Sequence, residues 1–255
     1  MRRTDSEFEA VKALLATGLS GYAVARATGV PRSTVAYWAQ RARRHRPWRP
    51  ADPDWRPPDG ESYSYLLGLY LGDGHIVEAG CSAYLRITLD LLYEGIIERA
   101  TAALASTFRP APVCRYTRRH GDEDDRCAIL QLSSPDLPVA FPQHGTGRKH
   151  LRSIALVDWQ RELTRHHPEA LLRGLIHSDG ARCLNRFATK LPSGRIARYE
   201  YPRYFFSNLS DDIRRIFCEH CELLGIRWTQ SNHRNISVSH RDSVALLDSF
   251  IGPKR

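Results

Sequence analysis

The stretch Leu66-Leu67-Gly68-Leu69-Tyr70-Leu71-Gly72-Asp73-Gly74 decides how most of this chain folds, because it reads as a buried helix that ends in Asp-Gly. A second copy, Leu172-Arg173-Gly174-Leu175-Ile176-His177-Ser178-Asp179-Gly180, begins 106 residues later. Two copies at the spacing of a half-domain, each followed by segments that read as strands, indicate an internal duplication.

Small residues recur four positions apart in each copy, and we expect them to form one helix interface: Gly68, Gly72, Gly174 and Ser178. Without bulky side chains the two helices can pack backbone to backbone, so Asp73 and Asp179 emerge side by side at the helix C-termini. The helix dipole disfavours negative charge there. A pair of carboxylates in that place needs a cation, and oxygen ligands favour Mg²⁺ or Mn²⁺.

Each acid is followed by a glycine, Gly74 or Gly180, which suits the left-handed conformation that often ends a helix. The two apolar-Asp-Gly motifs together resemble the LAGLIDADG homing endonuclease family in its single-chain, two-motif form. The resemblance covers the chain from Glu61 to the C-terminus. It implies that Asp73 and Asp179 are catalytic and hold divalent metal ions, which activate water and stabilise the leaving oxygen of a phosphodiester.

Two further positions bear on the activity that the resemblance implies. The family usually has a polar, solvent-positioning residue at the end of the second strand, where the second half offers Asn208 as a catalytic residue and the first half offers Leu89. The family also has a basic residue, commonly Lys, late in the last strand, where this sequence has Ser133 and Ser239. The first half therefore departs further from the family, which would make cleavage slow, confined to one strand, or absent.

The segments after each motif predict the same order of elements twice. The expected strands are 75–78, 83–90, 113–119, 126–132, 182–190, 196–208, 227–230 and 236–239, and the expected helices are 94–108, 210–224 and 244–251. Each half is thus expected to be αββαββα. The resemblance implies two curved sheets over double-stranded DNA, with polar side chains in the major groove: Arg86, Arg115, Arg119, Arg182, Arg186, Lys190, Arg198, Arg203, Arg227 and Gln230.

The positive charge of the chain is concentrated at its N-terminal end. Lys and Arg number 37 and Asp and Glu 28, giving a net charge of +9, yet residues 1–50 alone hold ten basic and three acidic residues. Such a segment favours a polyanion, and in the first place DNA, as its partner. Its apolar spacing predicts helices over 7–17, 21–28 and 31–44, with a sharp turn at Gly29.

This N-terminal pattern resembles the helix-turn-helix family. Val24, Val30, Val35 and Trp38 can converge as one small core around the turn. In the family the second helix of the motif lies in the major groove, which assigns DNA contacts to Arg32, Ser33, Tyr37, Gln40, Arg43 and Arg44. A small helical bundle that binds protein is the alternative interpretation.

Prolines and tryptophans between positions 47 and 60 cannot continue a helix and mark a linker. We divide the chain into a helix-turn-helix domain (1–46), a Pro-rich linker (47–60), a first LAGLIDADG half (61–147), an inter-half linker (148–167) and a second half (168–255). The expected fold class is α+β: a pseudo-symmetric duplicated αββαββα domain with two DNA-facing antiparallel sheets, plus a small all-α domain. Since both halves lie in one chain, we expect a monomer.

The composition excludes several other classes of protein. With 42% hydrophobic and 25% charged residues the chain is globular, and no apolar run approaches the roughly 20 residues of a membrane span. Six scattered cysteines without a secretory signal lead us to expect a cytoplasmic, nucleoid-associated protein of bacterial origin. Cys218 and Cys221 read as buried helix residues rather than zinc ligands, and the acidic segment 120–125 as a solvated turn.

Two functions from different classes stay open. A homing-type DNA endonuclease with an added reader domain is favoured by the presence of both Asp73 and Asp179. A non-cleaving transcriptional regulator, similar to sporulation regulators that join a degenerate LAGLIDADG scaffold to a helix-turn-helix, is favoured by Leu89, Ser133 and Ser239. We favour the endonuclease, because two unneutralised carboxylates in a helix interface are costly and a non-cutting protein would gain stability by losing one. Nothing in the sequence favours a third function, a maturase that assists intron RNA folding.

Overall fold

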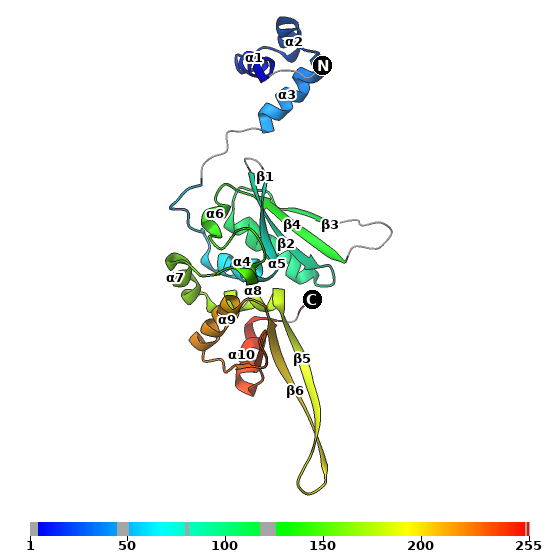
Figure 1. Cartoon of the computed structure of the whole chain (residues 1–255), viewed down its shortest axis with the longest axis vertical. Helices are drawn as coiled ribbons and strands as arrows, with labels where there is room; N and C mark the ends of the chain where they lie inside the picture. Colours follow the sequence, from blue (N-terminus) through cyan, green and yellow to red (C-terminus); the bar gives the residue numbers. More distant parts are fainter. Residues whose placement is uncertain (1–4, 45–50, 80–81, 118–125, 253, 255) are drawn as a thin grey trace. The chain divides into compact units, whose positions relative to one another are not determined.

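The chain forms two compact units, Met1–Arg49 and Pro50–Arg255. The computed structural model in Figure 1 describes residues 5–44, 51–79, 82–117, 126–252 and 254. Each unit has a hydrophobic core of its own. Within the described residues, no helix combines the length and the apolar composition that crossing a membrane requires.

The N-terminal unit consists of three helices, α1 (Asp5–Ala16), α2 (Gly21–Thr28) and α3 (Arg32–Arg44). Helix α2 begins where the Ser20 hydroxyl accepts a hydrogen bond from a backbone N–H of the first turn, and it ends at Gly29, whose φ of 67° favours glycine. The predicted core is present: Val24, Val30, Val35 and Trp38 are buried together with Val11. Trp38 is 8% exposed and is therefore a core residue.

The second unit, which we call the body, is α+β, as predicted, and repeats one order of elements. The first half runs α4 (Gly60–Asp73), β1 (Gly74–Ala79), β2 (Ser82–Asp90), α5 (Glu94–Thr107), β3 (Cys114–Thr117), β4 (Cys127–Ser133) and α6 (Leu137–Ala140). The connection holds η1 (Lys149–Leu151) and α7 (Asp158–His166). The second half runs α8 (Pro168–Asp179), β5 (Gly180–Lys190), β6 (Ile196–Ser207), α9 (Asp211–Leu223), β7 (Thr229–Gln230), β8 (Asn235–Val238) and α10 (Arg241–Phe250). The order αββαββα is thus present twice.

Each half contains one four-stranded antiparallel sheet, with strand orders β1-β2-β4-β3 and β5-β6-β8-β7. One face of each sheet packs on helices: Ile87 is buried in the core, and Phe206 stacks on Phe217 of α9 at 4.5 Å between ring centroids. We call the face that includes these residues the helix-covered face. Side chains alternate along a strand, so Arg86 and Phe205 lie on the opposite face, which we call the open face.

The motif helices α4 and α8 pack against each other at the centre of the body, between the two sheets (Figure 1). A Cβ on Gly68 would lie 2.5 Å from a backbone oxygen of α8, and a Cβ on Gly174 would collide with the carbonyl oxygen of Tyr65. Gly72 faces Ser178 in the same way. The two backbones therefore approach as closely as the small residues of the two motifs predict.

The glycines that follow the two helices correct one prediction. Gly74 has a φ of −88° and Gly180 a φ of −109°, so both are extended and neither is a left-handed cap. Glycine is required at both positions for a steric reason. A Cβ would lie 2.6 Å from the Cα of Tyr70 in the first copy and 2.7 Å from the Cα of Ile176 in the second. The chain passes directly from helix into strand at both positions, and only glycine leaves room for that change of direction.

Candidate active site

Asp73 and Asp179 are the last residues of α4 and α8, and the close packing of these helices brings their carboxylates together. A Cβ on Gly72 would lie 3.0 Å from Oδ2 of Asp179, so the second carboxylate reaches the end of the first helix. Burial, and then the negative charge of Asp179, raise the pKa of Asp73 to about 6, although Lys149 and Lys254 oppose the shift. The site thus holds repelling negative charge that a further cation would stabilise.

Two lysines lie beside the carboxylate pair, Lys149 from the connection that follows the first half and Lys254 from the end of the second half. Nζ of Lys149 donates to the carbonyl oxygens of Leu71 and Gly72 at 3.1 Å each, and Nζ of Lys254 donates to that of Gly180 at 2.5 Å. The last carbonyls of a helix lack intrahelical partners, so Lys149 satisfies those of α4, and both ammonium groups offset the negative ends of the two helix dipoles. Burial lowers the pKa of Lys149 to about 8 and also lowers that of Lys254, while both carboxylates oppose these shifts.

The positions of these lysines correct an expectation from the family pattern. That pattern points to Ser133 and Ser239 for the basic residue of each half, whereas the structure places Lys149 and Lys254 at the carboxylates, after the last strand of the half. A signal for them exists in the sequence. They lie 76 and 75 residues after the motif acid of their half, and the chain contains only four lysines.

The surroundings of the two acids differ at one further position. Nδ2 of Asn208 donates to Oδ2 of Asp179 at 2.6 Å, and this hydrogen bond opposes the rise in the pKa of Asp179 that burial causes. The counterpart of Asn208 in the first half is Leu89, because Ile87 and Phe206 hold equivalent places opposite the motif glycines. Leu89 is 4% exposed and belongs to the core. Among the described residues, the second acid alone is therefore oriented by an amide.

A hollow of about 530 Å³ opens beside Asp179, between the two halves of the body. The side chains around it are mainly basic or polar, and include His75, Arg148, Lys149, Asn208 and Arg234. A concave surface with several positive groups around a carboxylate suits a negatively charged phosphodiester better than a neutral substrate.

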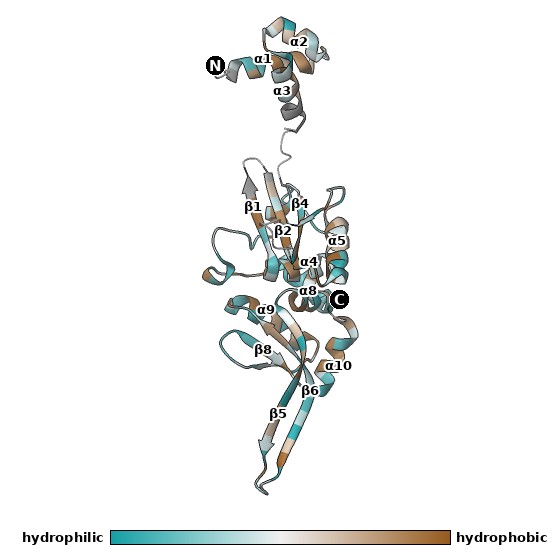
Figure 2. Ribbon diagram, turned by 90° about the vertical axis from the view of Figure 1, so that its right-hand side faces the viewer, coloured by the Kyte–Doolittle hydropathy of each residue, from teal (hydrophilic) through white to brown (hydrophobic). Residues whose placement is uncertain are grey.

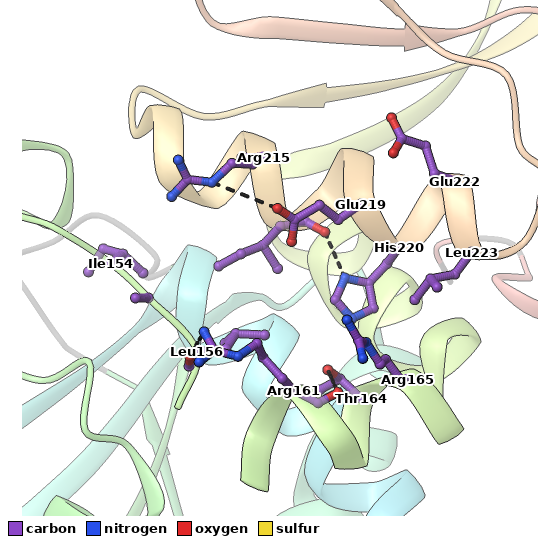
Figure 3. Close-up of a pocket in the computed structure, with 12 residues that line it drawn as sticks. Ile154, Leu156, Arg161, Thr164, Arg165, Arg215, Glu219, His220, Glu222 and Leu223 are labelled. Carbon is purple, nitrogen blue, oxygen red and sulfur yellow. Dashed lines mark hydrogen bonds and ion pairs between the residues drawn. The ribbon is translucent and has the colours of Figure 1, made fainter. Parts of the chain in front are cut away.

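Another hollow, of about 540 Å³, lies against α7 and α9 and shares no lining residue with the one beside the carboxylates (Figure 3). Two of its three arginines are held by acids: Arg161 lies 2.5 Å from Asp158, and Arg215 lies 2.6 Å from Asp212. Figure 3 also shows Arg215 directed toward Glu219, at 3.8 Å. Acidic and basic side chains thus occur together around this hollow, whereas basic side chains predominate around the one beside Asp179.

The strand residues expected to contact DNA fall on both faces of the sheets. Arg86 and Arg203 lie on the open faces, where Arg86 donates to Gln131 at 2.7 Å and the Arg203 guanidinium lies 3.9 Å from the ring centre of Phe205. Strand pairing places five others on the helix-covered faces: Arg115, Arg182, Arg186, Lys190 and Arg198. A duplex lying on the open faces would be contacted by the first group.

Acids hold three arginines of the helix-covered faces. Arg115 forms a bidentate pair with Glu94 of α5, at 2.5 and 2.8 Å. Arg182 pairs with Asp248 of α10 at 2.7 Å, and Arg186 pairs with its strand neighbour Glu200 at 2.9 Å. Alternation in the sequence groups these arginines correctly by face, but it does not show which face the helices cover.

The other expected contacts lie elsewhere in the chain. Arg227 approaches His240, with 3.1 Å between Nη2 and Nδ1, and Gln230 donates to the carbonyl oxygen of Asn232 at 3.1 Å. In the N-terminal unit, Arg32, Ser33 and Tyr37 are exposed on α3, Tyr37 to 60%. Arg119 lies outside the described residues, as do the side chains of Gln40, Arg43 and Arg44.

No protein-family model matches the sequence, and no curated protein matches it. Solved structures do match. The fold is similar to that of LAGLIDADG proteins. Full-length DUF199/WhiA from Thermatoga maritima is 13% identical with a TM-score of 0.47, and the match covers 80% of this chain and 59% of that one. The homing endonuclease I-WcaI, bound to its DNA recognition sequence, is 12% identical with a TM-score of 0.49 over 78% of this chain and 84% of that one.

The meganuclease I-AabMI, bound to uncleaved DNA, is 12% identical with a TM-score of 0.43, and the match covers 74% of this chain and 82% of that chain. The chain therefore spans less than two thirds of the WhiA chain but most of each of the two nucleases.

Proposed function

We propose that this protein binds double-stranded DNA and hydrolyses its phosphodiester bonds with a divalent metal ion, Mg²⁺ or Mn²⁺, held by Asp73 and Asp179. The observation that carries the proposal is the half-buried carboxylate pair at the ends of α4 and α8. The pKa of both acids is raised, and Lys149 and Lys254 lie beside them. An acid whose pKa is raised as far as that of Asp73, beside a second carboxylate, is typical of functional sites.

The donor set of this site fits a hard divalent cation. Asp73 and Asp179 would supply carboxylate oxygens, the ligands that Mg²⁺ prefers, and a bound cation would reduce their mutual repulsion. Among the described residues no third acid, histidine or cysteine joins them, so further ligands would be water and phosphate oxygens. When bound, the metal ion supplies Lewis acidity and lowers the pKa of coordinated water.

The chain's own groups have separate roles in the proposed reaction. Asn208 orients the Asp179 carboxylate through its 2.6 Å hydrogen bond and leaves the second oxygen available. Lys149 and Lys254 hold positive charge beside the carboxylates, where it would attract a phosphate group. Because the pKa of Lys149 is lowered to about 8, its ammonium group is also able to give up a proton near neutral pH.

DNA binding itself is proposed to use both units. In the body, the open faces of the two sheets carry Arg86 and Arg203. In the N-terminal unit, the exposed residues Arg32, Ser33 and Tyr37 of α3 occupy the place from which a helix-turn-helix reads the major groove. Since each chain supplies both acids, one copy is sufficient for a complete centre, and we propose that the protein acts as a monomer.

The test is to incubate the full chain with a pool of random DNA duplexes and either Mg²⁺ or Mn²⁺, and to map any ends by sequencing. We expect ends at a defined sequence that disappear with Asp73→Asn or Asp179→Asn. Asp90→Asn, the same change at an exposed carboxylate, is the matched control and should cut normally. Specific binding without ends under either metal would contradict hydrolysis.

A non-cleaving DNA-binding regulator is the second candidate, and two observations favour it. Leu89 replaces a polar residue beside the first acid, and the ammonium groups of Lys149 and Lys254 already offset part of the carboxylate charge without a metal ion. These lysines lower the cost of keeping both acids in a protein that does not cleave DNA. In the DNA-pool experiment this candidate predicts enrichment of one bound sequence and uncut DNA.

A further inference from the structure

The β5–β6 hairpin is much longer than its counterpart in the first half. Strands β5 and β6 pair at eleven positions, from Gly180 with Phe206 to Lys190 with Ile196, whereas β1 and β2 pair at six. Figures 1 and 2 show that the outer part of the hairpin extends past the helices of the second half. We call residues 183–203 the arm. It is an extension that the duplicated fold does not require.

The arm carries an excess of positive charge. It contains five basic residues, Arg186, Lys190, Arg195, Arg198 and Arg203, and one acid, Glu200. The acid is engaged by Arg186 at 2.9 Å, which leaves the other four without an opposing charge within the arm. A surface of this kind favours a polyanion and disfavours both a membrane interior and an apolar protein core.

One face of the arm is aromatic. Directly paired residues share a face of a sheet, so the register puts Phe187 opposite Tyr199 and Asn185 opposite Tyr201, all on the open face. The rings of Phe187 and Tyr199 stack with centroids 5.1 Å apart and planes at 22°, and Tyr201 meets Phe187 edge-on at 6.1 Å. Nδ2 of Asn185 donates to the Tyr201 hydroxyl at 2.9 Å and holds that ring in place.

These rings are exposed although they are large. Phe187 is 44% exposed and Tyr199 46% exposed. Farther along the same face, the guanidinium carbon of Arg203 lies 3.9 Å from the ring centre of Phe205. Planar side chains therefore extend along this face from the arm to Phe205. Exposed, contiguous aromatic surface of this kind usually marks an interaction site.

Charge and aromatic surface together identify the partner. Base pairs of a duplex offer only their edges, which polar side chains read, while their faces are covered by their neighbours. Unpaired bases offer their faces, and proteins bind them by stacking on aromatic side chains of a basic sheet surface. We propose that the open face of the arm binds unpaired nucleotides, with bases stacked on Phe187 and Tyr199. This inference rests on the proposed nucleic-acid binding but does not need cleavage.

The experiment compares three fluorescein-labelled probes of one sequence, namely a 20-nucleotide DNA strand, its duplex and the matching RNA strand, with the full chain. The variant Phe187→Leu/Tyr199→Leu keeps apolar surface but removes the rings. We expect its affinity for the DNA strand to fall about tenfold, the usual scale for loss of one or two base stacks, with duplex affinity within twofold of wild type. A similar loss for the RNA strand would show that the bases, rather than the sugar, are recognised.

The matched control changes charge on the opposite face of the same strands. Lys190→Ala/Arg198→Ala should weaken binding of all three probes by the same small factor, because these charges lie behind the binding face and act only through the long-range field of the arm. A third variant, Phe187→Trp, keeps a ring and should bind the DNA strand at least as well as wild type. If Phe187→Trp binds normally, the loss of affinity in the leucine variant comes from the missing rings and not from a misfolded hairpin.

The possible results separate this inference from the proposed function. Unchanged binding of the DNA strand by the leucine variant, or an equal loss for strand and duplex, would overturn base stacking on the arm and leave duplex binding standing. Failure of the wild-type protein to bind the DNA strand would overturn the inference about the arm, whereas the proposed duplex recognition is tested by the random-pool experiment. Loss with the leucine variant and recovery with Phe187→Trp, at constant duplex affinity, supports the arm as a site for unpaired nucleotides.

Discussion

At the Asp73 carboxylate, burial and the neighbouring acid outweigh the attraction of two lysines, since the pKa rises to about 6 rather than falling. Burial also raises the pKa of Asp179, but there the amide of Asn208 donates a hydrogen bond to the carboxylate and opposes the rise. The two acids are equivalent in sequence and in backbone position but not in chemistry. If the centre cuts DNA, the strand served by Asp179 should be cut faster.

The raised pKa of Asp73 makes stability depend on pH. The folded-state pKa of about 6 exceeds the ordinary value of 3.8, so the folded protein binds this proton more tightly than the unfolded chain. Stability is therefore lost as pH rises from about 4 to about 6, and the penalty is complete above that window. We expect Asp73→Asn to raise the free energy of unfolding at pH 8 by about 1 to 3 kcal/mol, with little effect at pH 4.

Urea unfolding at pH 4 and pH 8 in EDTA measures this difference. Adding Mg²⁺ at pH 8 should stabilise the wild type more than the variant, because binding requires the ionised carboxylate. The same change at Asp90 is the control. Equal unfolding midpoints for the wild type and Asp73→Asn at pH 8 would show that the acid is not under electrostatic stress.

At the scale of elements, the pair α4 and α8 determines the geometry of the centre. The helices approach so closely that backbone atoms of one fill the space that side chains of the other would take at Gly68 and Gly174. Glycine in the middle of a helix usually costs stability, and here that cost is offset by the backbone contact. The separation of the two carboxylates therefore depends on residues that carry no functional group.

Gly174→Ala should destabilise the body by at least about 3 kcal/mol, because the new Cβ meets backbone atoms, which cannot rotate away as a side chain does. Gly145→Ala is the control, since its Cβ would lie 3.5 Å from the Arg152 guanidinium, an ordinary contact. Urea midpoints of the two variants give the comparison. A Gly174→Ala protein as stable as Gly145→Ala would contradict the close packing.

At the scale of the whole molecule, the chain consists of two units with separate cores. In the described part of the N-terminal unit five residues form the buried core, whereas the core of the body runs through both halves. A unit with so small a core is marginally stable. We propose that it folds and unfolds independently of the body, across the Pro-rich segment between them.

Trp38→Ala should therefore abolish the unfolding transition of the N-terminal unit and leave that of the body unchanged. The cost of removing a buried tryptophan, about 3 to 5 kcal/mol, approaches the whole stability of such a unit. Tyr37→Ala, at the neighbouring exposed ring, is the control and should preserve both transitions. Calorimetry shows the transitions, and hydrogen exchange assigns them; a lower body transition in Trp38→Ala would contradict independence.

The sequence by itself determined the duplication, the order αββαββα, the small core of the N-terminal unit and the meeting of Asp73 with Asp179. These features follow from local rules, because the periods of helix and strand and the positions of small residues are written along the chain. The conformation of Gly74 and Gly180 did not follow, since a glycine suits both a left-handed cap and a close approach, and only the neighbouring helix backbone shows which applies.

Only the tertiary structure decided which lysines join the acids and which arginines remain on the open faces. Lys149 and Lys254 lie in segments without regular period, so nothing local links them to helix ends 75 or 76 residues earlier. For the strands, alternation groups residues by face, but the face is chosen by the packing of helices, which turns Arg115 and Arg182 toward acids. Both features depend on contacts between segments that are distant in the sequence, and these contacts form only when the chain folds.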